Sequence, residues 1–294
     1  MDIKKWLKIN TSNLKDKNVV VTGATGGLGK ELCFYLAELN ANITLACRNE
    51  KLANSLKEEI LSKFPQTTIN FVSLDLGNMQ SVNSCIEQLK NLNGIDVLIH
   101  NAGVYNVPVI TLDTGYNNIF QINFLAPYYM TKKLMPELEK KENSVCMVIG
   151  SVAHNYSKLN ENDVDFSSYK KPSKIYGNSK RFLMFSLFEL FKNKKNVSLA
   201  VAHPGITLTN MTNHYPKAIN WLVKIGIKLI FASPKKATLN LVKGIFTPCG
   251  YHEWIGPKVF NIWGNPQKKI LNTCNNIESL NIYNIAEEIY FKLL

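Results

Sequence analysis

The sequence predicts an α/β fold in which a parallel, doubly wound sheet of about seven strands carries helices on both faces. Short apolar runs rich in β-branched residues alternate with amphipathic helical patterns along most of the chain. A glycine-rich turn joins the first apolar run to the first helix. The chain has no internal repeat and no linker-like segment, and 294 residues are enough for one large core. We therefore predict a single domain over residues 1–294.

The stretch from Val19 to Gly29 predicts a strand, a tight turn and the start of a helix. Its three consecutive valines are typical of a central parallel strand that is buried on both faces. The glycines that follow leave backbone N–H groups bare where the helix dipole is positive, and such a terminus binds phosphate. A plain glycine-rich turn is the alternative. We favour a dinucleotide site that includes Gly23, Thr25, Gly26, Gly27, Leu28 and Gly29.

Strands and helices continue to alternate after this turn, which predicts repeated parallel β-α-β units. The later strands are predicted at residues 43–47, 69–74, 97–99, 145–149 and 197–202. Helices are predicted at about 50–63, 81–92, 115–138, 174–191 and 277–294. In a sheet of this kind ligands bind at the carboxyl ends of the strands. Polar residues directly after the predicted strands are therefore the candidates for a site.

Three strand ends carry candidate cofactor contacts. Arg48 follows the second strand, where its guanidinium suits the 2′-phosphate of NADP(H), although a plain surface arginine is the alternative. After the third strand, Asp75 next to Leu76 either accepts a bond from the adenine amino group or caps the next helix. The fourth strand ends in small residues that let a backbone approach a cofactor closely, namely Asn101, Ala102 and Gly103.

Tyr176 and Lys180 lie four residues apart and therefore share one face of a predicted helix. There the ammonium is expected to lower the phenol pKa from about 10 toward the working pH. Reduction of a carbonyl needs such an acid, because the new alkoxide must take up a proton. Ser151, just past the fifth strand, can hold the substrate oxygen, and Asn123 can order a water behind the lysine.

Together these motifs resemble the short-chain dehydrogenase/reductase family from Asn18 to about Trp263. They follow the family order: Thr-Gly-x-x-x-Gly-x-Gly from Thr22, Asn101-Ala102-Gly103, Asn123, Ser151, Tyr176-x-x-x-Lys180 and Pro204-Gly205. Three features resemble its retinol dehydrogenase-like branch: Ala46-Cys47-Arg48-Asn49, the long gap from Ser151 to Tyr176, and His203-Pro204-Gly205. That branch usually takes NADP(H) and apolar carbonyls or alcohols.

The resemblance implies a Rossmann-type fold with a cofactor-binding and catalytic core at 18–205 and a substrate-side lid with C-terminal helices at 206–294. It implies that Tyr176 is the catalytic acid/base and that Lys180 also binds the nicotinamide ribose. Ser151 would position the substrate, and Asn123 would support a proton relay. The nicotinamide end would meet Pro204, Gly205, Ile206 and Thr207. Residues 153–173 and those past Thr209 match no specific member, so the substrate is predicted only as an apolar aldehyde, ketone, retinoid-like or steroid-like molecule.

Composition bears on partners and location. The net charge is +12, but the lysines are scattered in pairs without interleaved aromatics, so we predict a solvated surface and no nucleic-acid partner. The basic segment 1–17 has too short an apolar patch for a signal peptide, which predicts a cytoplasmic protein. The six cysteines include no Cys-x-x-Cys pair, so we predict buried core thiols and no metal site.

Two stretches near the C-terminus bear on the substrate. Residues 217–231 are mostly apolar, with lysines and one asparagine at helical spacing, and they are too short and too charged to span a bilayer. They form either a lid over an apolar pocket, which we favour, or a helix that contacts a membrane surface peripherally. The last helix either closes the pocket or forms a homodimer contact.

The motifs favour one function over two others. A sugar-nucleotide epimerase or dehydratase shares Tyr-x-x-x-Lys but usually has a Gly-x-x-Gly-x-x-Gly turn and a longer C-terminal region. A non-catalytic cofactor-sensing protein has no need of a proton donor such as Tyr176. We therefore predict an NADP(H)-dependent oxidoreductase that interconverts an apolar alcohol and a carbonyl by hydride transfer.

Overall fold

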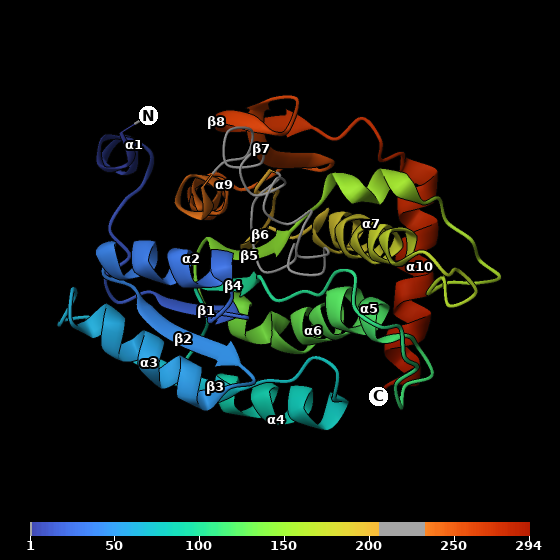
Figure 1. The fold of residues 1–294 in the computed structure, drawn as a ribbon, viewed down its shortest axis with the longest axis horizontal. Helices are drawn as coiled ribbons and strands as arrows, with labels where there is room; N and C mark the ends of the chain where they lie inside the picture. The colour runs from blue at the N-terminus through green and yellow to red at the C-terminus, as the bar shows by residue number, and fades with distance from the viewer. Residues whose placement is uncertain (1, 206–232) are drawn as a thin grey trace, which may run out of the picture.

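The computed structural model describes residues 2–205 and 233–294, and in these ranges eight strands form one sheet (Figure 1). Their order across the sheet is β3-β2-β1-β4-β5-β6-β7-β8. The strands are β1 Asn18–Thr22, β2 Asn42–Cys47, β3 Ile69–Ser73, β4 Val97–His100, β5 Ser144–Ile149, β6 Val197–Ala202, β7 Glu253–Val259 and β8 Trp263–Ile270. Neighbours from β3 to β7 are parallel, and β8 returns antiparallel to β7. The predicted fold class is confirmed, with an antiparallel edge strand added.

Helices cover both faces of the sheet. The described helices are α1 Ile3–Asn10, α2 Gly27–Glu38, α3 Glu50–Leu61, α4 Met79–Lys90, α5 Asn118–Phe120, η1 Gln121–Leu125, α6 Ala126–Glu139, η2 Val152–Tyr156, α7 Pro172–Phe191, α9 Pro234–Phe246 and α10 Asn276–Lys292. Apolar side chains of α1, α2, α3 and α9 share one core cluster, and those of α4, α6, α7 and α10 share the other. Figure 1 shows these two groups on opposite sides of the sheet, with α10 packed outside α7.

The triple-valine run shows why β1 is central. Val19 and Val21 belong to one core cluster and Val20 to the other, because successive strand residues point to opposite faces. None of the three side chains is more than 1% exposed. The prediction of a strand buried on both faces is confirmed.

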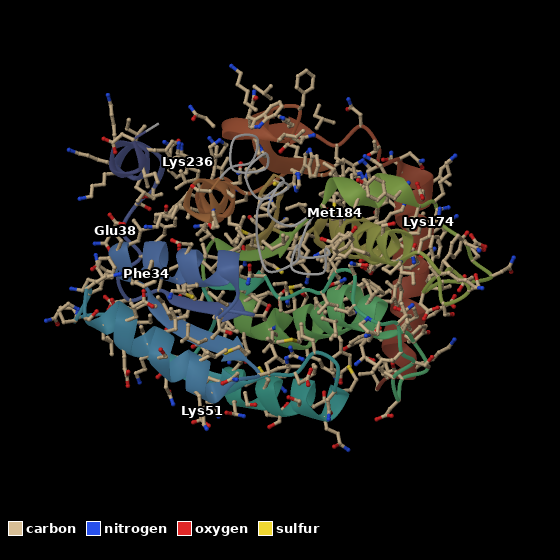
Figure 2. The ribbon with its side chains drawn as sticks, viewed as in Figure 1. Phe34, Glu38, Lys51, Lys174, Met184 and Lys236 are labelled. Atoms are coloured by element: carbon tan, nitrogen blue, oxygen red, sulfur yellow. The ribbon has the colours of Figure 1, made fainter. Side chains whose placement is uncertain are left out.

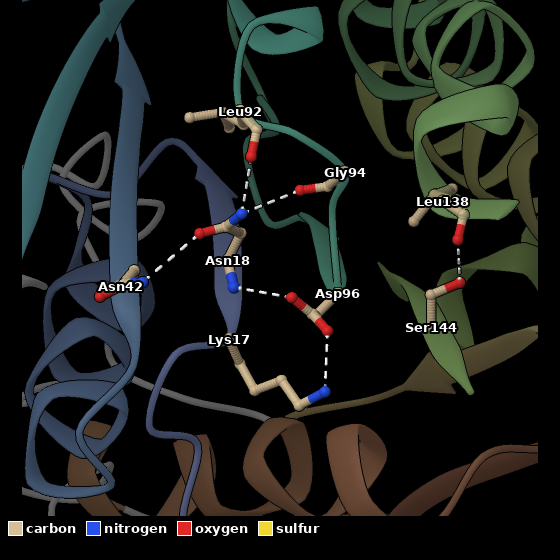
Figure 3. A network of polar contacts seen from close by, with 8 residues as sticks. All are labelled: Lys17, Asn18, Asn42, Leu92, Gly94, Asp96, Leu138 and Ser144. Atoms are coloured by element: carbon tan, nitrogen blue, oxygen red, sulfur yellow. Dashed lines mark hydrogen bonds and ion pairs between the residues drawn. The ribbon is translucent and has the colours of Figure 1, made fainter. Parts of the chain in front are cut away.

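The amino edge of the sheet is cross-linked by polar side chains (Figure 3). The Asp96 carboxylate accepts from the backbone N–H of Asn18 at 2.9 Å and from Lys17 Nζ at 3.0 Å. Asn18 Nδ2 in turn donates to the carbonyl oxygens of Leu92 at 2.8 Å and Gly94 at 3.0 Å. These bonds tie the start of β1 to the segment that leads into β4, so the two strands reach the opposite, carboxyl edge in fixed register.

One helical prediction needs correction, and one helix was not predicted. The predicted continuous helix 115–138 is divided into α5, the π-helical turn η1 and α6, and α6 ends at Glu139. The unpredicted helix is α1, near the N-terminus, which Asp2 caps by accepting from Lys5 N. Trp6 and Leu7 of that helix are buried, so the short apolar patch packs onto the domain.

The surface is charged at many separate places. Figure 2 shows Lys51, Lys174 and Lys236 well apart from one another around the molecule. Five of the six cysteines are buried and Cys249 is partly buried, as predicted for core thiols. Within 2–205 and 233–294, no helix has the length and apolar character needed to cross a bilayer.

Candidate cofactor and catalytic site

A cleft of about 460 Å³ opens at the carboxyl ends of the central strands. Every cofactor candidate predicted from the first four strand ends lines it: Gly23, Thr25, Gly26, Gly27, Leu28, Gly29, Arg48, Asp75, Leu76, Asn101, Ala102 and Gly103. The lining also includes residues that were not predicted as contacts, namely Ala46, Cys47, Asn49, Leu52, Leu74, Val104 and Ile122. Most of these adjoin predicted strand ends and could have been found by that signal. Leu52 of α3 and Ile122 of η1 reach the cleft only through the tertiary packing of their helices.

Close backbone contacts explain two of the glycines in the turn. Gly23 has φ +63°, and a Cβ there would lie 2.8 Å from Ala102 Cα. A Cβ on Gly29 would lie 2.4 Å from the carbonyl oxygen of Gly23. Asn101 Nδ2 donates to the carbonyl oxygens of Thr22 and Gly23, both at 3.0 Å, which fixes the turn against the end of β4.

The amino end of α2 faces this cleft with bare backbone. Its N-cap residue is Gly26, which supplies no side-chain hydrogen bond to the first N–H groups. The first four N–H groups of a helix have no partner within it, and the dipole makes this end positive. The terminus can therefore hold the pyrophosphate of a dinucleotide.

The charged side chains around the cleft have distinct roles. Arg48 is exposed at the end of β2, and no described carboxylate pairs with it. Lys30 pairs with Glu59 at 2.5 Å, so its charge is already matched. The Asp75 carboxylate accepts from the Gly77 N–H at 2.9 Å.

The helix-cap alternative for Asp75 is wrong. Asn78 caps α4, because its Oδ1 accepts from Gln80 N at 2.9 Å and from Ser81 N at 3.2 Å. Asp75 lies outside the cap and lines the cleft. Its predicted bond to an adenine amino group stays a prediction.

The structure brings Ser151, Tyr176 and Lys180 together where β5 ends against α7. Ser151 leads into η2, and its hydroxyl is near enough to the Tyr176 phenol to lower the pKa of that phenol, against the larger effect of burial. Lys180 is 3% exposed, and its Nζ donates to the carbonyl oxygen of Ile149 at 2.9 Å. The same Nζ lies 5.8 Å from the centroid of the Tyr176 ring.

The pKa values of this group differ from the expectation. Burial raises the pKa of Tyr176 to about 12, opposed by the hydrogen bond with Ser151 and assisted by nearby Tyr105. Burial lowers the pKa of Lys180 to about 8. The predicted lowering of the phenol pKa is therefore wrong for this structure, because desolvation of the phenolate outweighs the favourable contacts.

Asn123 lies in the π-helical turn η1 and is fully buried. Its Oδ1 accepts from Val104 N at 2.8 Å, and its Nδ2 donates to Val104 O at 2.9 Å and to Ser179 Oγ at 3.2 Å. π-Helical turns occur frequently at functional sites. Here the turn lets one amide hold the loop after β4 and the helix that carries Tyr176. Its water-ordering role stays a prediction.

The residues predicted near the nicotinamide are only partly described. Pro204 and Gly205 are buried just past β6, and Gly205 has φ +84°. A Cβ on Gly205 would lie 3.0 Å from Pro257 Cγ, so β7 crosses close to this turn. Ile206 and Thr207 lie outside the described residues, as does the stretch 217–231.

Comparison with known proteins agrees with the geometry. The sequence model of the family described as short chain dehydrogenase matches residues 17–220. The chain is 31% identical over 251 residues to the short-chain dehydrogenase TIC 32 B, chloroplastic, of Brassica napus, which covers 80% of this chain and 75% of that protein. It is 30% identical over 214 residues to retinol dehydrogenase 14 of Homo sapiens, which covers 67% of this chain and 64% of that protein.

Solved structures share the fold. A crystal structure of an uncharacterised protein from Mycobacterium paratuberculosis superposes with a TM-score of 0.75 at 21% identity, over 96% of both chains. L-Sorbose reductase from Gluconobacter frateurii, complexed with NADPH and L-sorbose, superposes with a TM-score of 0.60 at 18% identity, over 80% of this chain and 90% of that one. With the family match over 17–220, the chain belongs to the short-chain dehydrogenase family, whose members are oxidoreductases that use NAD(P)(H).

Proposed function

We propose that this protein is an NADP(H)-dependent oxidoreductase that interconverts an apolar alcohol and a carbonyl. The observation that carries the proposal is the meeting of the cleft and the catalytic group at Gly103. Gly103 lines the cleft, and a Cβ there would lie 3.7 Å from Lys180 Nζ. A dinucleotide in the cleft would thus end beside Ser151, Tyr176 and Lys180.

Two features of the cleft support NADP(H) as the cofactor. The bare N-terminus of α2 would hold the pyrophosphate, and Arg48 would bind the 2′-phosphate of the adenosine ribose. Three solved structures of similar fold name NADPH: the L-sorbose reductase, a short-chain dehydrogenase from Sphingobium yanoikuyae and the NADPH-dependent 3-quinuclidinone reductase from Rhodotorula rubra. When bound, the cofactor supplies or accepts the hydride.

Side chains of the protein would then bind the substrate oxygen and transfer its proton. The hydroxyls of Ser151 and Tyr176 would hold the oxygen by hydrogen bonds. In reduction Tyr176 would give its phenolic proton to that oxygen, and in oxidation it would take the proton back. Lys180, whose Nζ lies near Gly103 at the edge of the cleft, would hold the nicotinamide ribose.

Apolar side chains beside the catalytic tyrosine support an apolar substrate. Tyr176 packs against a buried cluster of Ile119, Phe166 and Ile175 together with Val104, Val107 and Tyr169. The Tyr105 ring meets the Tyr176 ring edge to face, with centroids 5.0 Å apart. An alcohol or carbonyl with an apolar body would be desolvated here without leaving polar groups unpaired.

Several further proposals concern the rest of the chain. We propose a single domain, with 18–205 as the core and 206–294 as the substrate side, in which 217–231 forms a lid. Contact of 217–231 with a membrane surface is the alternative. A cytoplasmic location and a homodimer contact through the last helix also remain proposals.

The test is turnover by wild type and by Tyr176→Phe. A panel of aldehydes, ketones and secondary alcohols is screened with NADPH and NADH by the absorbance of the reduced cofactor. We expect NADPH-dependent turnover of apolar members, and a loss of about 10²–10⁴-fold in Tyr176→Phe because the acid is removed. NADPH binding should stay within about twofold, since the phenol oxygen contributes little to it. Retained turnover in the variant would contradict the role of Tyr176.

A further inference from the structure

The helix that carries Tyr176 and Lys180 presents a second pair of residues at the same spacing. Gly177 and Arg181 follow the first pair by one position each, and they contact η2, the turn that begins just after Ser151. A Cβ on Gly177 would lie 2.3 Å from the carbonyl oxygen of Ala153. Arg181 Nη1 donates to the carbonyl oxygen of His154 at 2.9 Å. The helix therefore touches η2 directly at two points.

Arg181 is itself fixed by the C-terminal helix. Its Nε and Nη2 donate to the two carboxylate oxygens of Glu278 on α10, each at 2.6 Å. The arginine and glutamate side chains are only 7% and 16% exposed. A bidentate, charge-assisted pair of this kind is stronger than a neutral hydrogen bond and fixes the plane of the guanidinium. The third donor, on Nη1, is thereby aimed at η2.

His154 completes the connection to Ser151. The Nδ1 of His154 lies 2.6 Å from the backbone carbonyl oxygen of Ser151, and Nε2 lies 2.6 Å from the hydroxyl of Thr273. A carbonyl only accepts, so Nδ1 carries the proton, and in the neutral ring Nε2 accepts from the threonine. The imidazole is 1% exposed, so its place is set by these two bonds and by packing.

We propose that Arg181, Glu278, His154 and Thr273 form a positioning network that holds Ser151 against Tyr176, which makes the segment leading into α10 a required part of the catalytic site. The inference rests on the proposed function, in which Ser151 holds the substrate oxygen. None of the four residues lines the cofactor cleft. Loss of the network should therefore reduce turnover without weakening NADPH binding.

The chain offers a matched control on the same helix. Glu287 of α10 pairs with Lys132 of α6 at 2.5 Å, with side chains 19% and 18% exposed. Both ion pairs dock α10, but Glu287 has no contact with η2 in the described structure. If Glu278 served only to dock the helix, Glu278→Gln and Glu287→Gln should have the same effect on the site. A larger effect of Glu278→Gln than of Glu287→Gln would show that Glu278 also positions η2.

The variants are Glu278→Gln, Thr273→Val and the two controls Glu287→Gln and Thr273→Ser. Three quantities are measured: amide hydrogen exchange of residues 152–156, kcat with a carbonyl found in the panel, and the Kd for NADPH. We expect Glu278→Gln and Thr273→Val to speed exchange and to lower kcat, each about tenfold, because a charge-assisted or buried hydrogen bond is lost. Both controls should stay within about twofold, since Thr273→Ser keeps the hydroxyl. NADPH affinity should be unchanged throughout.

Two results would overturn the network. One is an equal effect of Glu278→Gln and Glu287→Gln on exchange at 152–156, and the other is unchanged exchange in Thr273→Val. The exchange measurement needs no substrate, so it also separates this inference from the proposed function. If exchange responds as expected while wild type turns over no carbonyl, the positioning of the segment is supported and the proposed reaction is wrong.

Discussion

Lys180 is an ammonium held almost out of contact with water. It is 3% exposed, and its Nζ donates to the carbonyl oxygen of Ile149 at 2.9 Å. Burial lowers its pKa to about 8, and within residues 2–205 and 233–294 no carboxylate pairs with it. The folded state is destabilised by this charge at neutral pH, so the residue is kept at the expense of stability. That is the pattern expected of a functional group.

Because the buried charge of Lys180 destabilises the folded state, we predict that the Lys180→Met variant is more stable than wild type but inactive. Below pH 8 the lysine is protonated in both the folded and the unfolded state, so its full burial cost is present at pH 7. Removing it should raise the free energy of unfolding by about 1–3 kcal/mol at that pH. The gain should shrink between pH 8 and the ordinary lysine pKa of about 10.4, because the folded wild type loses its proton first. Denaturant titrations across this range test it, and a less stable variant at pH 7 would contradict it.

Arg48 predicts the choice of cofactor. A guanidinium makes bidentate, charge-assisted bonds to a phosphate that it cannot make to a hydroxyl. Such bonds contribute about 1.5–3 kcal/mol, so Arg48→Ala should lose roughly ten- to a hundredfold in NADPH affinity while NADH affinity barely changes. Lys30 is paired with Glu59 and should not compensate.

Fluorescence titrations of both cofactors give the four dissociation constants. Arg48→Lys is the matched control, because it keeps the charge without the fork and should fall between wild type and Arg48→Ala. Equal loss of NADPH and NADH affinity in Arg48→Ala would show that Arg48 does not bind the 2′-phosphate.

At the scale of elements, the turn from β1 to α2 depends on one close approach. A Cβ on Gly29 would lie 2.4 Å from the carbonyl oxygen of Gly23, which is backbone and cannot move aside cheaply. At Gly26 the same oxygen would lie 3.3 Å away. Gly29→Ala should therefore distort the turn, with a destabilisation of about 1–3 kcal/mol and a loss of NADPH affinity of at least about tenfold.

Gly26→Ala is the matched control for this prediction, and both its affinity and its melting temperature should change less. Thermal melts and cofactor titrations compare the two variants. Wild-type affinity in Gly29→Ala would mean that the turn adapts and that the contact with Gly23 does not shape the site.

Among the strands, those with runs of buried apolar residues are the most predictable. β1, β5 and β6 were found because a buried parallel strand needs nothing but apolar side chains. The hairpin of β7 and β8 was missed because β8 is an edge strand with mostly exposed positions, and both strands contain proline. The π-turn η1 was missed because its pattern is that of an ordinary helix, and only the contacts of Asn123 distinguish it.

At the scale of the whole molecule, the site draws on nearly the full length of the chain. The glycine turn, the strand-end residues and the Tyr-x-x-x-Lys pair were predictable, because each is a local motif and a parallel sheet brings its strand ends to one edge. The pairing of Arg181 with Glu278 was not predictable, because the two residues are 97 positions apart and the sequence around each gives no sign of the other. Long-range polar pairs of this kind are visible only once the helices are packed.

The last prediction concerns how the whole basic molecule meets a membrane. The net charge is +12, and Lys51, Lys174 and Lys236 lie well apart around the molecule (Figure 2). Attraction between exposed charges is screened beyond about 8 Å at physiological salt. Spread charge alone should therefore not hold the protein on anionic vesicles at that salt. If residues 217–231 formed an interfacial helix, that helix would hold the protein on the vesicles, because its apolar side chains would be buried in the lipid while its lysines contact the headgroups. As we propose a lid, we expect equal recovery in the supernatant with and without vesicles. Salt-reversible sedimentation that Lys224→Glu with Lys228→Glu abolishes would show that the stretch is an anchor instead.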